Sequence, residues 1–403
     1  MGKPKIRFKG FTEDWEQRKL GDLVDRVTRK NQDLVSELPL TISAQYGLID
    51  QNEFFDKRVA SKDVSGYYLI ENGEFAYNKS TSTDAPWGAI KRLERYENGV
   101  LSTLYIVFRI KDDASIDSDF LVSYYSTNLW HKGIHEIAAE GARNHGLLNI
   151  APTDFFDTKL AIPQDVEEQC RIGQCFTKLE ALITLHQRKC DETKKLKKYM
   201  LQKMFPQNGT KVPEIRFEGF TDDWEQRKLG DLAMFNPKDE LPQEFEYVDL
   251  ESVVGTEMLS HRTEIKATAP SRAQRLARTG DLFYQTVRPY QKNNYLFEKS
   301  DNNYVFSTGY AQMRPFIDGY FLLSLVQGEC FVKVVLDNCT GTSYPAINAN
   351  DLAKIVVTVP SDKDEEEKIG ALFRNLDNLI TLHQRKCDEL VKIKKYMLQN
   401  MFV

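Results

Sequence analysis

Two segments of this chain occur twice, and this duplication constrains its fold more than any other feature of the sequence. RFKGFTEDWEQRKLGDL occupies residues 7–23, and RFEGFTDDWEQRKLGDL occupies residues 216–232. LITLHQRKCDE lies at residues 182–192 and again at residues 379–389. Such near-identity indicates two copies of one structural framework, each in the order short segment, variable region, long segment.

The regions between the copies, roughly residues 24–162 and 233–359, differ in sequence almost throughout. Apolar runs such as LYIVFRI and AKIVVTV predict short strands, and helical patterns lie between them. Two pairs of landmarks nonetheless match: NGEFAYNKS (72–80) with TGDLFYQTV (279–287), and STLYIVFR (102–109) with STGYAQMR (307–314). We interpret the two regions as domains of one mixed α/β fold that carry different surfaces.

The long repeated segments are predicted to be helices. Each follows a proline with an acidic turn, PQDVEEQ or PSDKDEEEK, and ends among lysines, as the helix dipole favours. Mostly apolar residues at spacings of three and four predict a coiled-coil seam. The predicted seam consists of Ile172, Cys175, Leu179, Leu182, His186, Lys189, Thr193, Leu196 and Met200, and of Ile369, Leu372, Leu376, Leu379, His383, Lys386, Leu390, Ile393 and Met397. A helix with one apolar stripe needs a partner, so we expect the two copies to pair antiparallel. The alternative is that each helix packs on its own domain.

His186 and His383 are equivalent positions at the centre of this seam, and we predict a polar layer that sets the register rather than a catalytic pair. The expected fold is α+β and pseudo-two-fold symmetric, with two mixed α/β domains separated by two long helices that form an antiparallel coiled coil. The predicted boundaries are 1–162 for the first domain, 163–206 for the first helix, 207–359 for a linker and the second domain, and 360–403 for the second helix.

Composition narrows the possible functions. The formal net charge of −5 argues against a strong, sequence-independent polyanion binder, so any nucleic-acid surface must be local. No apolar run approaches the ~18 residues of a membrane span, and the N-terminus lacks an apolar signal region. The six cysteines form no C-x-x-C pair and are expected to be reduced thiols rather than zinc ligands. We therefore expect a cytoplasmic protein.

The layout resembles the specificity (S) subunit of type I restriction-modification enzymes. The resemblance is carried by WEQRKLGDL at each domain start, by the IP or VP step before an acidic helix entry, and by the helix LITLHQRKCDE with its KKYMLQ end, all present twice. It covers essentially the whole chain. It implies two target recognition domains, each of which reads one half of a split double-stranded DNA sequence in phage defence. It also implies two modification (M) subunits that dock on the conserved regions and methylate adenine with S-adenosylmethionine. Restriction (R) subunits, with ATP and Mg, would then join to cleave DNA.

The chain itself shows no catalytic, cofactor or metal motif. An adenine methyltransferase needs an Asx-Pro-Pro-aromatic motif, yet no two prolines are adjacent, and nothing fits a glycine-rich nucleotide loop. DTK at 157–159 and EIK at 264–266 match a nuclease D/E-x-K fragment, as expected by chance in so charged a chain. We predict a non-catalytic subunit that binds no cofactor. The alternatives are a stand-alone nuclease or methyltransferase with a degenerate site, and a coiled-coil scaffold that touches no nucleic acid.

Candidate DNA-binding residues are basic and polar side chains bunched in predicted loops, because these present the donors and acceptors that base edges need. Residues 261–292 hold seven basic and two acidic side chains, and YQTVRPYQKNN at 284–294 follows a predicted strand. TGTSYPAIN at 340–348 contains a Gly-Thr-Ser turn that the resemblance places near DNA. The candidates in the second domain are Arg275, Arg288, Tyr290, Lys292, Asn293, Thr342, Ser343 and Tyr344.

The corresponding loops of the first domain are YNKSTSTDAPWGAIKR at 77–92 and EGARNHGLLN at 140–149. The candidates there are Lys79, Ser80, Thr81, Ser82, Arg143, Asn144 and His145. Trp87 is expected to pack rather than to stack on a base. The lysines at 194–198 are interpreted as a solvated helix end, with the phosphates of an unread DNA spacer as the alternative contact.

Overall fold

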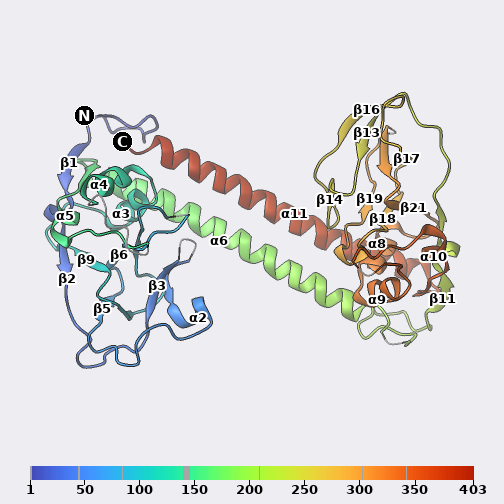
Figure 1. The fold of residues 1–403 in the computed structure, drawn as a ribbon, viewed down its shortest axis with the longest axis horizontal. Helices are drawn as coiled ribbons and strands as arrows, with labels where there is room; N and C mark the ends of the chain where they lie inside the picture. The colour runs from blue at the N-terminus through green and yellow to red at the C-terminus, as the bar shows by residue number, and fades with distance from the viewer. Residues whose placement is uncertain are drawn as a thin grey trace. The chain divides into compact units, whose positions relative to one another are not determined.

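The computed structural model describes residues 2–43, 46–83, 85–138, 146–207, 209–301, 303–341 and 343–403. It divides into two compact units, Met1–Leu185 with Lys386–Val403, and His186–Arg385. Each unit holds one variable region and part of each long helix (Figure 1). Within the described ranges no single helix is long and apolar enough to cross a membrane, and Gly319–Gln327 and Glu329–Asp337 pass that test only as a pair bent by 68°.

Both units are built on the same four-stranded antiparallel sheet. The strand order is β2-β9-β6-β7 in the first unit and β12-β21-β18-β19 in the second. The strands of the first sheet are β2 (Val24–Val27), β9 (Ile106–Ile110), β6 (Phe75–Asn78) and β7 (Ala89–Arg92). Those of the second sheet are β12 (Ala233–Phe235), β21 (Tyr310–Pro315), β18 (Leu282–Gln285) and β19 (Tyr295–Leu296). The matching landmarks fall on β6 and β18 and on β9 and β21, which confirms the prediction of one fold in both regions.

The units differ in what they add to this sheet. The first unit adds the pair β3 (Leu40–Ser43) and β4 (Gly47–Asp50), helix α2 (Gln51–Phe55), and the pair β5 (Tyr68–Glu71) and β8 (Asn98–Leu101). The second unit adds a sheet in the order β16 (Arg262–Ile265), β13 (Glu244–Val248), β20 (Tyr304–Ser307) and β17 (Ala273–Leu276). It also adds the pair β14 (Val253–Val254) and β15 (Glu257–Met258), and the 3-10 turn η1 (Pro289–Gln291).

Each variable region begins and ends on an equivalent pair of strands. These pairs are β1 (Glu16–Lys19) with β10 (Lys159–Ile162), and β11 (Glu225–Lys228) with β22 (Val356–Val359). Both pairs are antiparallel and have the same register, Glu16 opposite Ile162 and Glu225 opposite Val359. Helices α1 (Leu20–Leu23) and α7 (Leu229–Leu232) follow β1 and β11 directly and bury both of their leucines. The short repeated segment thus holds the two ends of each variable region together.

The same repeated segment is fixed to the first turn of each long helix by a buried ion pair. Arg7 donates two hydrogen bonds to Glu168, at 2.6 and 2.7 Å, and Arg216 donates two to Glu365, at 2.6 and 2.8 Å. Both glutamates are fully buried. The near-identity of the two copies therefore preserves one joint between the strand pair and the helix.

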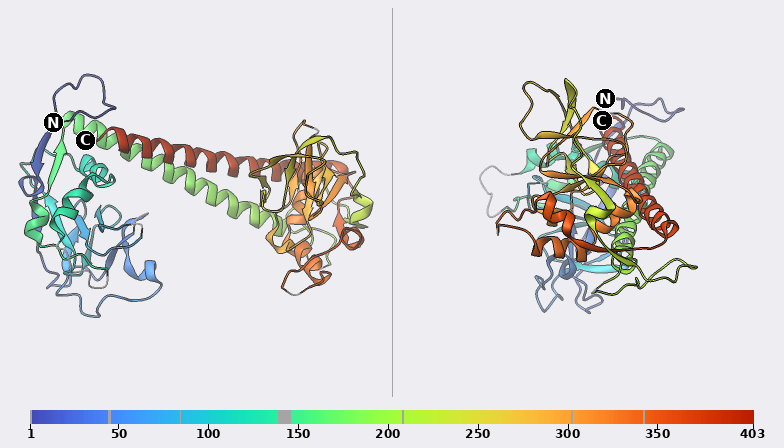
Figure 2. Two further views of the ribbon diagram at one scale, coloured as in Figure 1. Left: turned by 45° about the horizontal axis from the view of Figure 1, so that its top comes forward. Right: turned by 90° about the vertical axis from the view of Figure 1, so that its right-hand side faces the viewer.

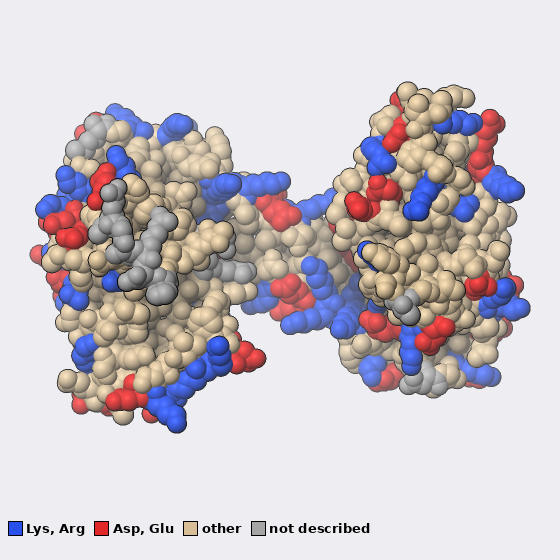
Figure 3. All heavy atoms as spheres, viewed as in Figure 1, with Lys and Arg blue, Asp and Glu red and all other residues tan. Residues whose placement is uncertain are grey.

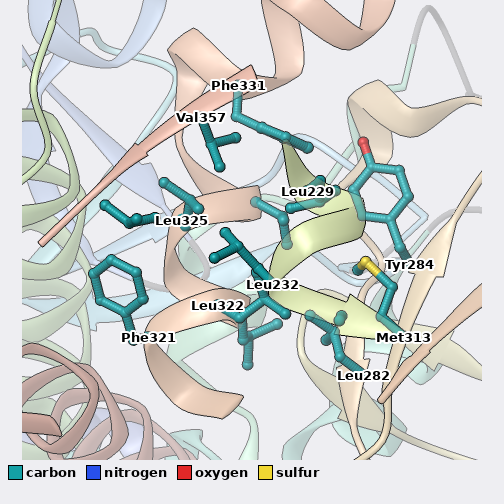
Figure 4. Packing of buried hydrophobic residues seen from close by; sticks show 14 of the residues in the cluster. Leu229, Leu232, Leu282, Tyr284, Met313, Phe321, Leu322, Leu325, Phe331 and Val357 are labelled. Atoms are coloured by element: carbon teal, nitrogen blue, oxygen red, sulfur yellow. The ribbon is translucent and has the colours of Figure 1, made fainter. Parts of the chain in front are cut away.

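Short helices follow the sheet in each unit. They are α3 (Ser118–Tyr125), α4 (Leu129–Ile137) and α5 (Pro152–Phe156), and α8 (Gly319–Gln327), α9 (Glu329–Asp337) and α10 (Ala349–Lys354). Asp117 and Asp318 cap α3 and α8, each by accepting a hydrogen bond from a backbone N–H of the first turn. Figure 4 shows the core of the second unit, in which α8 packs against α7 and the sheet. The labelled side chains are Leu229, Leu232, Leu282, Tyr284, Met313, Phe321, Leu322, Leu325, Phe331 and Val357.

The long helices have 38 residues each, which corresponds to about 57 Å at 1.5 Å per residue. They are α6 (Val166–Lys203) and α11 (Lys363–Asn400). Within each unit, their segments run side by side in opposite directions (Figure 2). In the first unit Lys394 is ion-paired with Glu180, and in the second Lys197 is ion-paired with Asp377 at 2.5 Å. The prediction of an antiparallel coiled coil is confirmed.

The seam of this coiled coil differs from the predicted one at every second position. Leu182 and Leu379 were expected inside but are 43% and 44% exposed. The buried positions lie one residue later along each helix, as at Phe176 and Cys190. Both spacings satisfy the heptad rule, because the first turns offer two neighbouring apolar residues, Cys175 and Phe176 in α6 and Leu372 and Phe373 in α11. The structure buries the phenylalanine in each case.

The histidine layer predicted at the centre of the seam is confirmed. His186 Nδ1 and His383 Nδ1 lie 3.0 Å apart, so one ring must donate and the other must accept. Burial lowers the pKa of His383, and the neighbouring His186 and Lys189 lower this pKa further. His383 therefore favours its neutral form.

Candidate nucleic-acid interface

In the second unit, the two loops that the sequence marks separately lie against each other. Arg288 N donates to Pro345 O at 2.8 Å, and Ile347 N donates to Thr286 O at 3.0 Å. Val287 and Ala346 form a bridge between these two bonds. The loop after β18 and the loop before α10 are thus one structural element.

The loop after β18 has a strained and closely fixed backbone. Arg288 and Lys292 flank η1 and have φ of 52° and 57°, which side chains other than glycine rarely adopt. Gln285 N donates to Asn294 Oδ1 at 2.9 Å, and Gln285 Nε2 donates to Val287 O at 2.7 Å and to Gln291 Oε1 at 2.8 Å. Gln285 and Asn294 are 2% and 1% exposed. Buried amides therefore determine the shape of the loop from beneath.

Two of the candidate residues help to fix this loop. Lys292 Nζ is ion-paired with Glu329 at 2.8 Å, and Asn293 Oδ1 accepts a hydrogen bond from Gly255 N at 2.8 Å. The Lys292 ammonium and the Asn293 amide oxygen are therefore engaged within the protein. Whether either residue also touches DNA stays a prediction.

Other candidates of the second unit are open to solvent. Tyr290 is 49% and Tyr344 is 65% exposed, and Ser343 is exposed as well. The Arg288 guanidinium lies over the Tyr344 ring, 4.4 Å from its centroid. Thr342 lies outside the described residues. This side of the loop pair presents an arginine and two aromatic rings.

Arg275 lies on β17, outside the loop pair. Burial lowers the pKa of its guanidinium, and its Nε is buried without a hydrogen-bond partner in the part of the chain that is described. Elsewhere in the basic segment, Arg262 is ion-paired with Asp249 and Arg278 with Asp239. The positive charge counted along the sequence is therefore partly neutralised in the fold.

The first unit contains the same loop pair. Leu148 N donates to Lys79 O at 3.0 Å, and Thr81 N donates to Gly146 O at 2.6 Å, while Ser80 and Leu147 form the bridge. These bonds match those of the second unit one for one, so Thr81 occupies the position of Arg288. The frame is the same and the side chains differ.

The polar candidates of the first unit are arranged along this pair. Burial lowers the pKa of Lys79, and the charge of Arg26 lowers it further. Ser82 Oγ accepts a hydrogen bond from Ala85 N at 3.1 Å. Trp87 packs edge-on against His135, in line with the packing role predicted for it. Arg143, Asn144 and His145 lie outside the described residues.

Basic and acidic side chains are interspersed on the face shown in Figure 3, and basic ones gather along the long helices. Of the lysines at the end of α6, Lys197 lies at the seam in its ion pair with Asp377, whereas Lys194, Lys195 and Lys198 are exposed. The lysine group is thus partly a seam contact and partly a solvated face.

Comparisons with known proteins find relatives that are restriction enzyme specificity subunits. No protein-family model matches the chain. It is similar to the type I restriction enzyme HindI specificity subunit of Haemophilus influenzae, with 24% identity over 45% of this chain and 41% of that protein. It is also similar to the type I restriction enzyme MjaVIII specificity subunit of Methanocaldococcus jannaschii, with 22% identity over 95% of this chain and 91% of that protein.

A solved structure shares the fold. The S subunit of a type I restriction-modification system from M. genitalium superposes with a TM-score of 0.64 at 14% identity, covering 100% of this chain and 99% of that chain. The resemblance carried by the duplicated segments is therefore confirmed: this chain has the fold of that type I S subunit, with two mixed α/β domains and an antiparallel coiled coil, and it is similar in sequence to restriction enzyme specificity subunits.

Proposed function

We propose that this chain is the DNA sequence-recognition subunit of a type I restriction-modification complex and reads a bipartite target with an unread spacer. The observation that carries the proposal is the repeated loop pair, in which one set of backbone bonds presents different side chains in each unit. Base edges are read by side chains, whereas the frame positions them. Two loop pairs with the same backbone and different side chains are therefore suited to an asymmetric DNA sequence of two parts.

The spacer would be set by the paired helices. Removing one heptad shortens a helix by about 10 Å, which corresponds to about three base pairs of duplex. A heptad deletion preserves the seam, because it removes one full repeat. The proposal thus links the length of α6 and α11 to the number of unread base pairs.

The test is to delete residues 187–193 from α6 and 384–390 from α11 together, and to map adenine methylation in a host that carries the full complex. We expect the spacer to shorten by about three base pairs, or methylation to disappear. Deleting the heptad from α6 alone shifts the helices out of register and serves as the contrast, with loss of methylation expected. An unchanged number of spacer base pairs in the double deletion would refute the proposal that helix length sets the spacer.

The surface of the long helices supports binding of two copies of a partner. Large apolar side chains are exposed in both copies of the repeat, as three equivalent pairs and at Leu382, whose counterpart Leu185 is half-buried. They are Leu182, Leu196, Tyr199, Leu379, Leu382, Ile393 and Tyr396, all between 40% and 60% exposed. Exposed apolar surface of this kind is typical of protein interfaces. We assign it to two M subunits, which would carry S-adenosylmethionine, and R subunits would add ATP and Mg²⁺.

The chain itself is proposed to be non-catalytic and to act on host and foreign DNA in the cytoplasm. The rival function is a stand-alone nuclease or methyltransferase. Incubation of the purified chain with DNA, Mg²⁺ and labelled S-adenosylmethionine separates the two, because any cleavage or label transfer would favour the rival.

A further inference from the structure

Arg288 differs from three other cations of the basic segment in what its side chain contacts. Arg262, Arg278 and Lys292 are each ion-paired with a carboxylate. Among the described residues, no carboxylate is paired with Arg288, whose guanidinium instead lies over the Tyr344 ring. Within the described ranges, its charge is therefore left without an acidic partner.

Stacking on Tyr344 covers one face of the guanidinium and leaves its edge available. A guanidinium carries its N–H donors in the plane of the fork, and cation–π contact uses the face of that plane. Tyr344 is 65% exposed and Arg288 is half-buried, so the pair lies at the surface. An arginine edge presented in this way matches the two acceptors, O6 and N7, that guanine shows in the major groove.

The backbone beneath Arg288 is fixed before any ligand binds. Its N–H donates to Pro345 O at 2.8 Å, and its C=O accepts from Gln291 N at 3.0 Å. Its left-handed φ of 52° is held by the buried amides of Gln285 and Asn294. A side chain on such a support loses less conformational freedom on binding, which favours a specific contact over a loose phosphate contact.

We propose that Arg288, held against Tyr344, recognises one guanine in the half-site read by the second unit, through two hydrogen bonds to O6 and N7. The inference rests on the proposed function and adds the identity of a base. Thr81, at the equivalent position of the first unit, cannot form this fork, so the two half-sites differ at this place.

The experiment maps adenine methylation in hosts that carry the full complex with the wild-type chain, Arg288→Ala, Arg288→Lys, Tyr344→Phe or Tyr344→Ala. Arg374→Ala is the matched control, because Arg374 also lies over a tyrosine ring, 5.0 Å from the centroid of Tyr320, but is ion-paired with Glu298. Thermal unfolding of each purified chain verifies that it is folded.

Arg288→Ala should lower the discrimination for guanine at one base pair of one half-site by about 5- to 140-fold, and leave the other half-site unchanged. Arg288→Lys keeps the positive charge but not the paired N–H donors of the guanidinium, so it should also lose discrimination for guanine. Tyr344→Phe should retain the motif, Tyr344→Ala should weaken the preference at the same base pair, and Arg374→Ala should change nothing.

Several results would overturn the inference. A wild-type motif in which neither half-site contains a G·C pair, or a motif unchanged in Arg288→Ala, excludes this contact. An even loss of methylation at all positions in that variant shows a phosphate contact instead. If the wild-type complex methylates no bipartite site, the proposed function itself fails, and with it this inference.

Discussion

Removal of the Glu365 carboxylate should destabilise the second unit strongly. Glu365 is fully buried and accepts two hydrogen bonds from Arg216 and one from Trp224 Nε1 at 3.2 Å. In Glu365→Ala, an arginine side chain that is only 11% exposed loses its counter-charge, and the indole N–H loses its acceptor. Breaking a buried ion pair by removing one partner costs about 3–5 kcal/mol of folding free energy.

The first unit provides a matched substitution. Glu168 forms the equivalent pair with Arg7, but Trp15 Nε1 is buried without a hydrogen-bond partner in the described part of the chain. Glu168→Ala therefore removes the ion pair without removing an indole hydrogen bond. Because a hydrogen bond to a charged group contributes about 1.5–3 kcal/mol and this one is long, Glu365→Ala should cost about 1.5 kcal/mol more than Glu168→Ala.

Calorimetry of the full chain measures both effects. At about 2–4 °C per kcal/mol for a unit of this size, Glu365→Ala should lower the Tm of its own unit by about 6–20 °C. Glu298→Ala, which removes an exposed ion pair with Arg374, is the control and should cost less than about 1 kcal/mol. The joint replacement Arg216→Met with Glu365→Leu should recover most of the loss, since apolar side chains of similar volume can replace a buried pair.

A cost for Glu365→Ala no larger than that of the exposed control would exclude a stabilising role for the buried ion pair. A larger loss in Glu168→Ala than in Glu365→Ala would show that the extra indole hydrogen bond contributes nothing to stability.

Two residues of α11 within the second unit, His383 and Gly370, have side-chain surroundings that affect stability. The pKa of His383 is lowered in the folded state, so the folded chain binds fewer protons than the unfolded chain near the ordinary histidine pKa of about 6.5. The stability that this provides is present above that pH and is lost as the pH falls through it, so urea unfolding should give a lower free energy at pH 5.5 than at pH 7.5. His383→Asn should reduce this difference, and an unaltered difference would exclude the His186–His383 pair as its source. Gly370 lies so close to the cap of α8 that a Cβ there would be 2.0 Å from Asp318 Oδ1. Gly370→Ala should therefore destabilise the second unit by about 1–3 kcal/mol in thermal unfolding, even though alanine is more favourable than glycine in a helix by about 1 kcal/mol. A raised Tm would show instead that α11 can move away from the Asp318 cap without cost.

The framework could be predicted from the sequence because the duplication exposes it. Residues kept in both copies, such as Arg7 and Arg216, belong to the joint with the long helix, and the acidic starts and lysine-rich ends mark the helix limits. The register of the seam could not be predicted. It depends on whether Cys175 or Phe176 faces the partner helix, and the spacing of the apolar residues allows both.

The candidate site could be predicted only in outline. Charge and polarity marked the loops that the structure brings together, but they did not show which side chains are engaged elsewhere. Lys292 and Asn293 meet Glu329 and Gly255, which are distant in sequence, and such contacts decide which groups stay available. The contact of Arg288 with Tyr344 likewise joins two segments that no local pattern connects.

The pairing of β1 with β10, and of β11 with β22, has a consequence for how such a chain can change. Each variable region leaves and re-enters the constant part at two neighbouring strands, so both of its ends are anchored at one place. A different insert whose ends lie one strand spacing apart, about 4.8 Å, could be accepted there without altering the helix or its buried joint. Under the proposed function, exchange of one variable region between the two nearly identical repeated segments would replace a reading domain as a unit and change the target sequence, while the long helices stay as they are.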